Sequence, residues 1–592
     1  MKAAWLSLPW FHALVVEAVQ DCKVTPKSPR WPSPSDWEQL NRTISGKLLN
    51  PLPPASVCHR NEPNFNPSQC VVVSTQWNSS VFHADDPLSV DWPNFNNDSC
   101  LPDPDAPCNK DGFPIFVVNA TSASDVQSAV NFSRQRNVRL VIKATGHDVL
   151  GRSTGSSSLS IWTHYMRGIT FNKNFQPQGC SSPLGLSSAT IAAGMQMGEI
   201  YAAAAQQNLT VVGGDVPTVG VIGLLTGGGY GPLSSTYGLA ADAALEFDIV
   251  TADGKLLTVN ECQHTDLFFA LRGGSAGTFG VVTSVTVRTF PNLSITTHVL
   301  TINATADSEA FWDTTALIHS DLPRLADGGL SGQYFILPNS SSAAGARVLG
   351  SQAASLQLGP GRGIISWALN IMNQPAAAAN GLVEPLLQQL KNSTWSSQIS
   401  IETETQEFQD FSSYADVFDG LQVVGVDGLI GGRFLDKKAL SRNKVDIKEA
   451  LKATITPAGG IILGEMLMGK GVWDAQPRGG DNAVSKAWRS AITNTLIPVG
   501  WAPLDARQKE LVTSELTNKN MAALRRLAPH TGVYLNECDP MEPNFQNSFW
   551  GDKYGKLLQI KQTYDPQGVF FCHPCVGSEF WIMRPDGQLC KI

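Results

Sequence analysis

The chain has 592 residues, of which 42 % are apolar and 16 % charged, and its formal net charge at pH 7 is −8. Because a domain usually holds about 100–200 residues, this length predicts two or three domains with sizeable cores. The acidic balance excludes the basic field that nucleic acid or an anionic membrane surface would need, so neither is an expected partner.

The first residues have the pattern of a secretory leader. One lysine precedes a mostly apolar run, and Val16-Glu17-Ala18 places small residues at the spacing of a cleavage site. We therefore expect residues 1–18 to be a signal peptide. No later window holds the roughly 18 apolar residues of a membrane span, so no membrane anchor is expected.

Sequons and cysteines favour an oxidising compartment. Ten Asn-x-Ser/Thr sequons occur, at Asn41, Asn78, Asn97, Asn119, Asn131, Asn208, Asn292, Asn303, Asn339 and Asn392. All eleven cysteines follow the predicted cleavage point, and Cys58, Cys70, Cys100 and Cys108 crowd into residues 19–109, a Pro/Asn-rich segment. We expect this segment to be an extension stapled by disulfides, and one of the eleven thiols to be free or paired outside the chain. The protein is expected to be secreted and to carry N-glycans; its oligomeric state stays open.

From about residue 110 the pattern becomes that of a mixed fold. FPIFVVNA predicts a strand, ATSASDVQSAVNFSRQRN a capped helix and VRLVIKATG a second strand, which together make a β-α-β unit. SLSIW, ATIAAG, LTVVGG, LEFDIVTADGKLLTV and GVVTSVTVRTF continue as strands. Residues 110–295 are therefore predicted to form a first domain.

The texture changes after Pro291. Helical windows, AFWDTTALIHSDLPRL and NGLVEPLLQQLKN, are mixed with strands, ISIETETQEF and GIILGEMLM, and predict a second α+β domain over residues 296–529. Residues 530–592 are aromatic and turn-rich like the first domain, to which we expect them to return.

Two glycine-rich stretches carry the strongest functional signal, at 144–155 and 213–254. Dense glycines let the backbone approach a ligand closely and turn N–H groups toward phosphate oxygens, so a dinucleotide is predicted. Gly227, Gly229 and Gly231 do not open a long helix, because Pro232 follows at once, and a Rossmann site is therefore excluded.

Several motifs in order resemble one family. They are ATGHDVLGRSTG, PTVGVIGLLTGGGYGPLSSTYGLAAD, LFFALRGGSAGTFGVVTSVTVRTFP, VYLNE and FWGDKYGKLLQIKQTYDPQGVF. Over about 110–290 and 530–581 the chain resembles the vanillyl-alcohol-oxidase-type flavoproteins, in their berberine-bridge-enzyme-like branch and its fungal secreted, isoamyl-alcohol-oxidase-like members. The resemblance implies an α+β, two-lobed FAD-binding PCMH-type fold, with a discontinuous FAD domain (110–295 plus 530–592) and a substrate domain (296–529) over the flavin.

The resemblance also implies how FAD is held. A histidine at the position of His147 bonds covalently to the 8α-methyl carbon of the flavin, a role that suits the nucleophilic imidazole. The further cofactor-binding residues implied are Thr145, Gly146, Asp148, Gly151, Ser153, Thr218, Gly220, Gly223, Gly228, Gly229, Tyr230, Tyr237, Asp242, Val282 and Asn536. Many relatives attach the flavin again through a cysteine, but Val216 stands at that position, so His147 is expected to be the single attachment.

The implied catalytic residues are Val219, Tyr534 and Glu465. Val219 falls at the position that admits or blocks O₂, and valine is typical of oxidases in this family. Tyr534 is expected beside the flavin and the substrate. Glu465 is the favoured general base, with Glu402 and Glu404 as the fallback on another strand; each also fits an ordinary structural role.

No metal site is expected. Cys572-His573-Pro574-Cys575 lacks the second ligand pair that a structural zinc needs, and disulfides that involve Cys572, Cys575 or Cys590 are favoured instead.

The sequence thus predicts a secreted FAD-dependent oxidase. It would take a hydride from an alcohol, a sugar-like hydroxyl or a secondary metabolite and pass the electrons to O₂, giving H₂O₂. Two alternatives stay open: a biosynthetic flavoenzyme that closes a ring or desaturates a bond, and a secreted flavin-containing binding or defence protein with little turnover.

Overall fold

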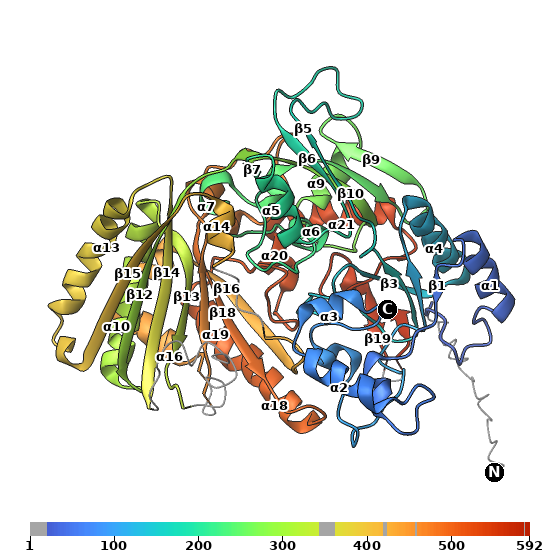
Figure 1. The fold of residues 1–592 in the computed structure, drawn as a ribbon, viewed down its shortest axis with the longest axis horizontal. Helices are drawn as coiled ribbons and strands as arrows, with labels where there is room; N and C mark the ends of the chain where they lie inside the picture. The colour runs from blue at the N-terminus through green and yellow to red at the C-terminus, as the bar shows by residue number, and fades with distance from the viewer. Residues whose placement is uncertain (1–20, 342–360, 418–422, 456–458, 585–586) are drawn as a thin grey trace, which may run out of the picture.

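The computed structural model describes residues 21–341, 361–417, 423–455, 459–584 and 587–592, so the predicted signal peptide lies outside the described residues. Figure 1 shows two lobes side by side, one built on a large sheet with its helices and the other on two smaller sheets. None of the helices within these ranges has both the length and the apolar character to cross a membrane.

The first lobe begins with a four-stranded sheet. Its order is β1 (Leu48–Leu49), β2 (Phe116–Asn119), β4 (Ser158–Trp162) and β3 (Arg139–Lys143), and the last three run parallel. The predicted β-α-β unit is present as β2, α4 (Ala123–Arg136) and β3, but β4 inserts between its two strands. Helix α4 starts at a capping box, in which Ser122 and Asp125 bond each other's backbone N–H groups.

A five-stranded antiparallel sheet completes this lobe. Its order is β5 (Ile169–Asn172), β6 (Ser188–Ala192), β10 (Val281–Arg288), β8 (Ala244–Val250) and β9 (Leu256–Asn260). The strands predicted at 245–259 are the β8–β9 pair. The prediction at LTVVGG was too long: only β7 (Leu209–Thr210) pairs there, with β11 (Phe290–Pro291). Gly214, at the end of this stretch, lines a large cavity between the lobes.

The second lobe is a seven-stranded antiparallel sheet. Its order is β15 (Ile399–Phe408), β12 (Ile295–Thr305), β14 (Arg362–Met372), β13 (Ser331–Leu337), β17 (Ile462–Met466), β18 (Ala491–Gly500) and β16 (Gly428–Asp436). Helices α10 (Glu309–Asp327), α13 (Ala376–Lys391), α16 (Lys444–Lys452) and α19 (Met521–Leu527) form one apolar core with the sheet (Figure 1). Because strand side chains alternate, Gln333, Phe335 and Glu465 point to the other side and line the ligand cavity.

Shorter helices complete the two lobes. They are α1 (Pro34–Thr43), α2 (Pro67–Gln76), α3 (Ser80–Asp85), α5 (Met197–Ala205), α6 (Val221–Thr226), α7 (Ser234–Tyr237), α8 (Ala240–Ala243), α9 (Thr265–Leu271), α14 (Phe411–Ala415), α15 (Lys437–Leu440), α17 (Lys470–Trp473) and α18 (Ala506–Glu515).

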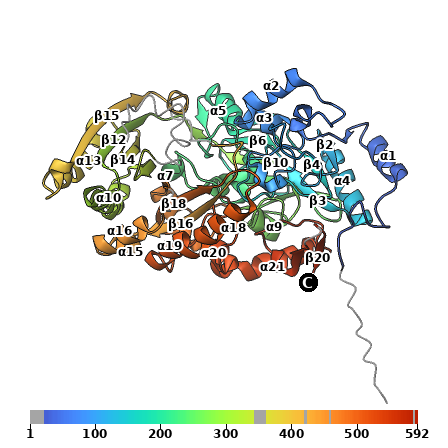
Figure 2. The ribbon, with the colours of Figure 1, turned by 90° about the horizontal axis from the view of Figure 1, so that it is seen from below.

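The C-terminal segment packs along the first lobe. It contains α20 (Phe545–Trp550), α21 (Tyr554–Tyr564) and the hairpin β19 (Trp581–Met583) with β20 (Leu589–Lys591), and Figure 2 shows α19, α20, α21 and β20 in succession along one side of the molecule. Helix α21 contacts α9, and Phe570 bridges to Leu140 of β3. This segment therefore connects elements far apart in the sequence.

The cysteines confirm the predicted disulfides. Five bonds form, Cys22–Cys590, Cys58–Cys70, Cys100–Cys108, Cys180–Cys262 and Cys572–Cys575. Two of them, Cys58–Cys70 and Cys100–Cys108, staple residues 19–109. Cys572 and Cys575 bond to each other, as favoured over a zinc site. The free thiol predicted from the odd count is the buried Cys538.

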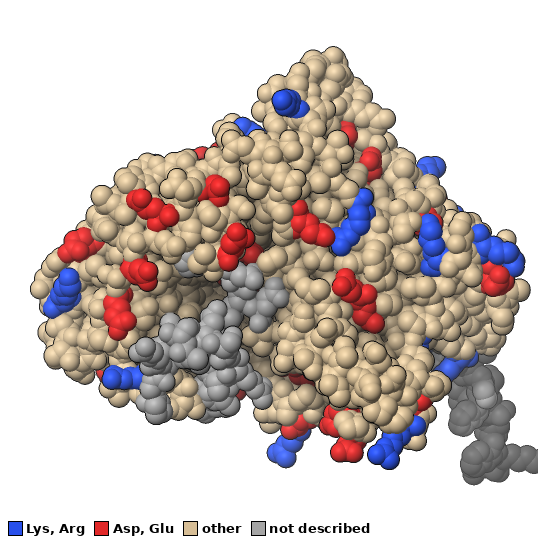
Figure 3. Space-filling view, viewed as in Figure 1, with Lys and Arg blue, Asp and Glu red and all other residues tan. Residues whose placement is uncertain are grey.

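Charges are scattered over the surface. On the face drawn in Figure 3, acidic and basic side chains stand singly or in small groups over both lobes, and the described residues form no basic patch there. The sequons differ in exposure: Asn78, Asn97, Asn208 and Asn392 are exposed, whereas the other six asparagines are partly buried.

Candidate active site

A large cavity lies between the two lobes. Its volume is about 1130 Å³, above the roughly 300–1,000 Å³ of usual small-molecule sites. Side chains from the four-stranded sheet, the glycine-rich segments, the seven-stranded sheet and the C-terminal segment all reach its wall. The cavity therefore has room for a large ligand together with a second, smaller one.

Most of the residues singled out from the sequence line this cavity. They are Thr145, Gly146, His147, Asp148, Ser153, Val219, Gly220, Gly223, Tyr230, Val282, Glu465, Tyr534 and Asn536. They come from positions up to 391 residues apart, so the fold brings them together rather than the local sequence.

Six predicted cofactor residues, Gly151, Thr218, Gly228, Gly229, Tyr237 and Asp242, are not part of the lining. Gly151 faces Phe95, where an added Cβ would lie 2.4 Å from the ring, and Tyr237 stacks on Phe290 with ring centroids 4.0 Å apart. Asp242 forms an ion pair with Arg489 at 2.7 Å. Gly151, Tyr237 and Asp242 therefore pack against other parts of the protein and do not face the cavity.

His147 follows β3 in a tight turn. Gly146 before it has φ +87°, and a Cβ there would lie 3.1 Å from the carbonyl oxygen of Ser89, so only glycine suits this position. The imidazole lies with Nε2 3.7 Å from a carboxylate oxygen of Asp91 and with its ring edge-on to Trp92. The N-terminal segment, predicted as a mere extension, thus supplies the surroundings of His147.

The glycine-rich turn at 214–223 forms the adjoining wall. Gly214, Val216, Val219, Gly220 and Gly223 all line the cavity. Val216, which stands where many relatives carry a cysteine, offers no thiol to the cavity. The buried thiol of Cys538 is not part of the lining either.

Three carboxyl groups, Asp215, Glu465 and Glu537, converge on the cavity. Glu465 lies directly opposite Gln333 in the β13–β17 pairing, and the Gln333 amide donates to Asp215. The Oε2 atom of Glu465 is buried and has no hydrogen-bond partner among the described residues. Burial, and then the charges of Asp215 and Glu537, raise the pKa of Glu465 well above its usual range.

Glu537 has better-satisfied surroundings. One of its oxygens accepts hydrogen bonds from the Tyr230 hydroxyl at 2.5 Å and from the Asn494 amide at 2.9 Å. Burial raises the pKa of Glu537 to about 7, while the hydrogen bond from Tyr230 opposes that rise. Burial, together with the nearby Glu537, raises the pKa of Tyr230.

Tyr534 is buried between two aromatic rings, those of Tyr230 and Trp488. Its hydroxyl accepts a hydrogen bond from the Asn536 amide at 2.9 Å, and the same amide donates to the Gly223 carbonyl at 3.0 Å. The Asn536 oxygen accepts from Arg152 at 2.8 Å. Tyr534 and Asn536 are thereby fixed to the glycine-rich wall.

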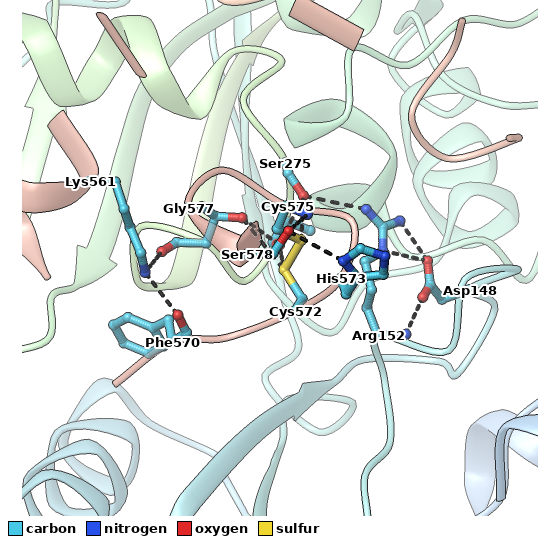
Figure 4. The surroundings of a disulfide bond; sticks show 12 residues. Asp148, Arg152, Ser275, Lys561, Phe570, Cys572, His573, Cys575, Gly577 and Ser578 are labelled. Carbon is cyan, nitrogen blue, oxygen red and sulfur yellow. Dashed lines mark hydrogen bonds and ion pairs between the residues drawn. A yellow bond between two sulfur atoms is a disulfide. The ribbon is translucent and has the colours of Figure 1, made fainter. Parts of the chain in front are cut away.

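A disulfide secures the same corner of the cavity. In Figure 4, Arg152 lies between Asp148 and Ser275, and Ser275 reaches Cys575 of the Cys572–Cys575 bond. Cys572 itself lines the cavity. The C-terminal segment is therefore clamped to the wall near the turn that carries His147.

The fallback base residues were wrong. Glu402 and Glu404 lie exposed on β15, an edge strand of the large sheet, and neither lines the cavity. The sequence could not show this exposure, because the alternation of side chains along a strand does not tell whether the strand lies at the edge of its sheet.

Sequence reasoning missed Asp91, Arg152, Asp215, Glu537 and Asp427. Glu537 directly follows Asn536 in the quoted VYLNE motif, which was the available signal. Asp215 lies within the glycine-rich stretch. Arg152 lies within the quoted ATGHDVLGRSTG motif, between Gly151 and Ser153. Asp91 and Asp427 had no signal in the sequence, since their importance depends on partners far along the chain.

The residues present fit FAD. The cavity is large enough for a dinucleotide, glycines at 146, 220 and 223 let its walls approach a ligand closely, and a histidine with one ring nitrogen buried against a carboxylate faces its interior. The charged groups on the lining beyond His147 are a single arginine and several carboxyls, so phosphate oxygens would rely mainly on backbone N–H groups and Arg152.

Comparisons with known proteins agree with this fit. A family model described as "FAD binding domain" matches residues 114–260, and one described as "Berberine and berberine like" matches 533–576. The chain is 36 % identical over 589 residues to an "Uncharacterized FAD-linked oxidoreductase" of Arthroderma benhamiae, covering 95 % of this chain and 94 % of that protein. It is 33 % identical to the "VAO-type flavoprotein oxidase VAO615" of Thermothelomyces thermophilus, with 96 % and 95 % covered.

A solved structure shows the same fold. The crystal structure of the VAO-type flavoprotein MtVAO713 from Myceliophthora thermophila C1 matches with a TM-score of 0.88 at 30 % identity, over 97 % of this chain and all of that one. The two-lobed PCMH-type fold expected from the sequence is confirmed. The chain therefore belongs to the vanillyl-alcohol-oxidase-type FAD-linked oxidoreductases, with a berberine-bridge-like C-terminal segment.

Proposed function

We propose that this FAD-linked oxidoreductase is an oxidase that carries FAD bound covalently through His147 and returns the electrons to O₂ as H₂O₂. The observation that carries the proposal is the convergence of His147, Val219 and the carboxyl–tyrosine set Glu465, Glu537 and Tyr230 on one cavity. When bound, the flavin supplies the hydride acceptor and the reaction with O₂. Valine at 219 leaves a modest side chain at the position expected to control the access of O₂.

The proton chemistry divides between two glutamates. Glu537, with a pKa of about 7, is the member of the cluster that ionises near neutral pH, and the Tyr230 hydroxyl bonded to it also lines the cavity. We assign proton acceptance to Glu537, with Tyr230 passing the proton from a substrate hydroxyl. Burial and its acidic neighbours raise the pKa of Glu465, the base favoured from the sequence, well above its usual range. This shift favours the protonated form, in which Glu465 would donate a hydrogen bond that orients the substrate oxygen.

The lining also selects the substrate. Its charged side chains are Arg152 and six acids, Asp148, Asp215, Asp427, Glu465, Glu515 and Glu537. Where β16, β18 and α18 form the wall, apolar residues such as Leu429, Ile497 and Val512 predominate. A largely apolar substrate with a hydroxyl at the reacting carbon, and without a carboxylate, fits this surface.

The test is anaerobic reduction. The purified protein is mixed with panels of apolar alcohols, sugars and phenolic or polyketide-like precursors while its flavin absorbance is followed, and H₂O₂ is measured after air is admitted. Bleaching by a substrate and stoichiometric H₂O₂ would support the oxidase. Bleaching without reoxidation by O₂ would reject O₂ as the acceptor, and flavin that no substrate bleaches would favour a binding or defence protein.

A biosynthetic role is the second candidate, favoured by the relatives. The chain is 34 % identical to the "FAD-linked oxidoreductase patO" of Aspergillus clavatus and 31 % identical to the "Bifunctional decalin synthase calF" of Penicillium decumbens, each over 96 % of its length. Turnover confined to complex precursors, with a cyclised or desaturated product, would favour this role over oxidation of simple alcohols.

We further propose that the protein is secreted and N-glycosylated. The five disulfides and the exposed sequon asparagines Asn78, Asn97, Asn208 and Asn392 support this. Mass spectrometry of the protein secreted by a eukaryotic host, before and after enzymatic deglycosylation, should find glycans at these four asparagines and a mature N-terminus near residue 19. An intracellular, unglycosylated protein would overturn the proposal.

A further inference from the structure

His147 is supported by a second segment of the chain on the side away from the cavity. A short piece of the N-terminal segment, residues 80–92, lies behind it and is tied to its turn. The backbone N–H of Asp91 donates to the Gly146 carbonyl at 3.3 Å, and the carbonyl oxygen of Asp91 accepts from Gly425 at 2.8 Å. The Lys143 ammonium, at the end of β3, donates to the His83 carbonyl at 3.0 Å and the Asp86 carbonyl at 2.7 Å.

The side chain of Asp91 is aimed at the imidazole. One carboxylate oxygen lies 3.7 Å from His147 Nε2, and the Asp91 side chain is only 1 % exposed. The same oxygen accepts a hydrogen bond from the Ser80 hydroxyl at 2.9 Å, which sets its direction. The other carboxylate oxygen is buried without a hydrogen-bond partner among the described residues, and so is His147 Nε2.

A buried carboxylate with so few hydrogen bonds lowers the stability of the fold, and its presence therefore calls for a functional explanation. The positive charge of Lys143 interacts with Asp91 and compensates part of that cost. Ser80 thus directs the Asp91 carboxylate toward one ring nitrogen of His147. Since Nδ1 and Nε2 lie on opposite sides of Cε1, this arrangement leaves Nδ1 as the nitrogen available to the cavity that His147 lines.

We propose that Asp91, directed by Ser80, is the positioning group for flavin attachment: it accepts the Nε2 proton of His147 while Nδ1 forms the bond to the flavin 8α carbon. This inference rests on the proposed attachment through His147. The reaction forms one C–N bond and breaks one C–H bond of the methyl group and one N–H bond of the imidazole. The two electrons stay on the flavin until O₂ takes them with two protons as H₂O₂.

The experiment follows attachment itself instead of turnover. The full chain is produced in a riboflavin-depleted host and supplied with FAD in air, and the flavin that stays with the acid-denatured protein is measured over time. Wild type, Asp91→Asn, Asp91→Glu and Ser80→Ala are compared. The matched control is Asp85→Asn, because Asp85 ends α3, the helix that begins with Ser80, but points to His164 and is 59 % exposed.

We expect Asp91→Asn to bind FAD and to unfold near the wild-type temperature, but to attach flavin at least tenfold more slowly. Asp91→Glu should restore part of the rate, Ser80→Ala should lower it, and Asp85→Asn should match wild type. Attachment at the wild-type rate by Asp91→Asn overturns the proposal. If Asp91→Asn does not fold, Ser80→Ala is the test instead. Attachment at the wild-type rate by Ser80→Ala would then overturn the proposal.

The same experiment distinguishes failure of the proposed covalent attachment through His147 from failure of the proposed role of Asp91. If wild type releases all its flavin on denaturation and His147→Ala binds FAD equally well, then His147 makes no covalent bond. That result rejects the attachment and with it the role of Asp91. Covalent flavin in wild type that is lost in His147→Ala but kept at the full rate in Asp91→Asn rejects the role of Asp91 alone.

Discussion

At the scale of single residues, the surroundings of two glutamates on the cavity wall differ, although only Glu465 was singled out from the sequence. Glu465 and Glu537 both line the cavity and both have a raised pKa, but only Glu537 receives two hydrogen bonds that favour its charged form. Such a separation of pKa values within one site is how enzymes assign the base and the hydrogen-bond donor.

Replacement of these residues tests the assignment. Glu537→Gln should slow substrate reduction of the flavin by on the order of 10²–10⁴, the usual contribution of a general base. Glu465→Gln keeps a hydrogen-bond donor, and we expect a loss below about tenfold. Stopped-flow anaerobic reduction measures both rates, with flavin content as the control.

The pH profile gives a second readout. A base must be ionised to act, so the wild-type reduction rate should rise with pH through about 7, the pKa of Glu537. Glu537→Gln should lose this rise, while Glu465→Gln should keep it. The reverse pattern would return the role of base to Glu465.

Asp427 is a residue whose charge should cost stability. It is 1 % exposed and lines the cavity, and burial, followed by the charge of Asp98, raises its pKa to about 7. Lys509 and Trp501 oppose that rise. A carboxyl group with a raised folded-state pKa stabilises the fold most at low pH, and this contribution is lost as pH rises through about 7.

We therefore expect Asp427→Asn to gain stability relative to wild type as pH rises. Melting temperatures of the two proteins, measured between pH 5 and pH 8 with equal flavin content, should diverge in favour of the variant at pH 8. A difference that does not vary with pH would show that Asp427 does not titrate in this range.

At the scale of elements, the large sheet holds Glu465 in place through close packing. Gly464, its neighbour on β17, lies opposite Tyr334 of β13. A Cβ on Gly464 would lie 1.8 Å from the Tyr334 ring, whose hydroxyl bonds His319 of α10 at 3.1 Å. The ring therefore lies flat over the glycine and connects the sheet to its helix.

Gly464→Ala should destabilise the protein by about 1–3 kcal/mol, because overpacking forces the Tyr334 ring aside. The matched control is Gly381→Ala in α13, where a Cβ would meet nothing within 4 Å; it should be neutral or stabilise by about 0.4–1 kcal/mol. Denaturant unfolding measures both. Equal midpoints for the two variants would contradict the packing argument.

The same scale shows what the sequence could predict. The capped helix at 123–136, the β8–β9 hairpin and the strands at 399–408 and 462–466 follow local periodicity and capping, and the structure contains them. The predicted length of the strand at LTVVGG was wrong: pairing ends at Thr210, and Gly214 lines a cavity that local patterns do not reveal.

The sequence singled out lining residues where motifs are contiguous, and it did not reveal contacts between residues far apart in the chain. His147, Val219 and Tyr534 belong to recognisable motifs. Asp91 lies 56 residues before His147 in a segment without periodicity, and Tyr230 lies 307 residues from its partner Glu537. Such pairs become visible only when the fold brings them together.

At the scale of the whole molecule, the two ends of the described chain meet on the first lobe. Cys22 and Cys590 form a disulfide across 568 residues, the backbone N–H of Lys23 donates to Leu589 at 2.8 Å, and Val24 bridges to Val138 just before β3. Val24 therefore lies beside the start of β3, the strand that leads to His147, and the C-terminal segment bridges to β3 through Phe570 and Leu140.

The Cys22–Cys590 disulfide should contribute more to the free energy of unfolding than the Cys572–Cys575 disulfide at the cavity wall does. The chain-entropy relation gives about 6 kcal/mol for a loop as long as that of Cys22–Cys590 and about 2 kcal/mol for the short loop of Cys572–Cys575. Residual structure in the unfolded chain reduces the first value more than the second, since a long loop leaves more room for it.

Two double variants separate stability from cofactor binding. Cys22→Ser with Cys590→Ser should lower the unfolding midpoint more than Cys572→Ser with Cys575→Ser does, while leaving flavin content near wild type. The second pair should retain less flavin, because Cys572 lines the cavity and Cys575 contacts Ser275 beside Arg152. Flavin loss confined to the first pair would mean that the joined ends, and not the wall disulfide, hold the site together.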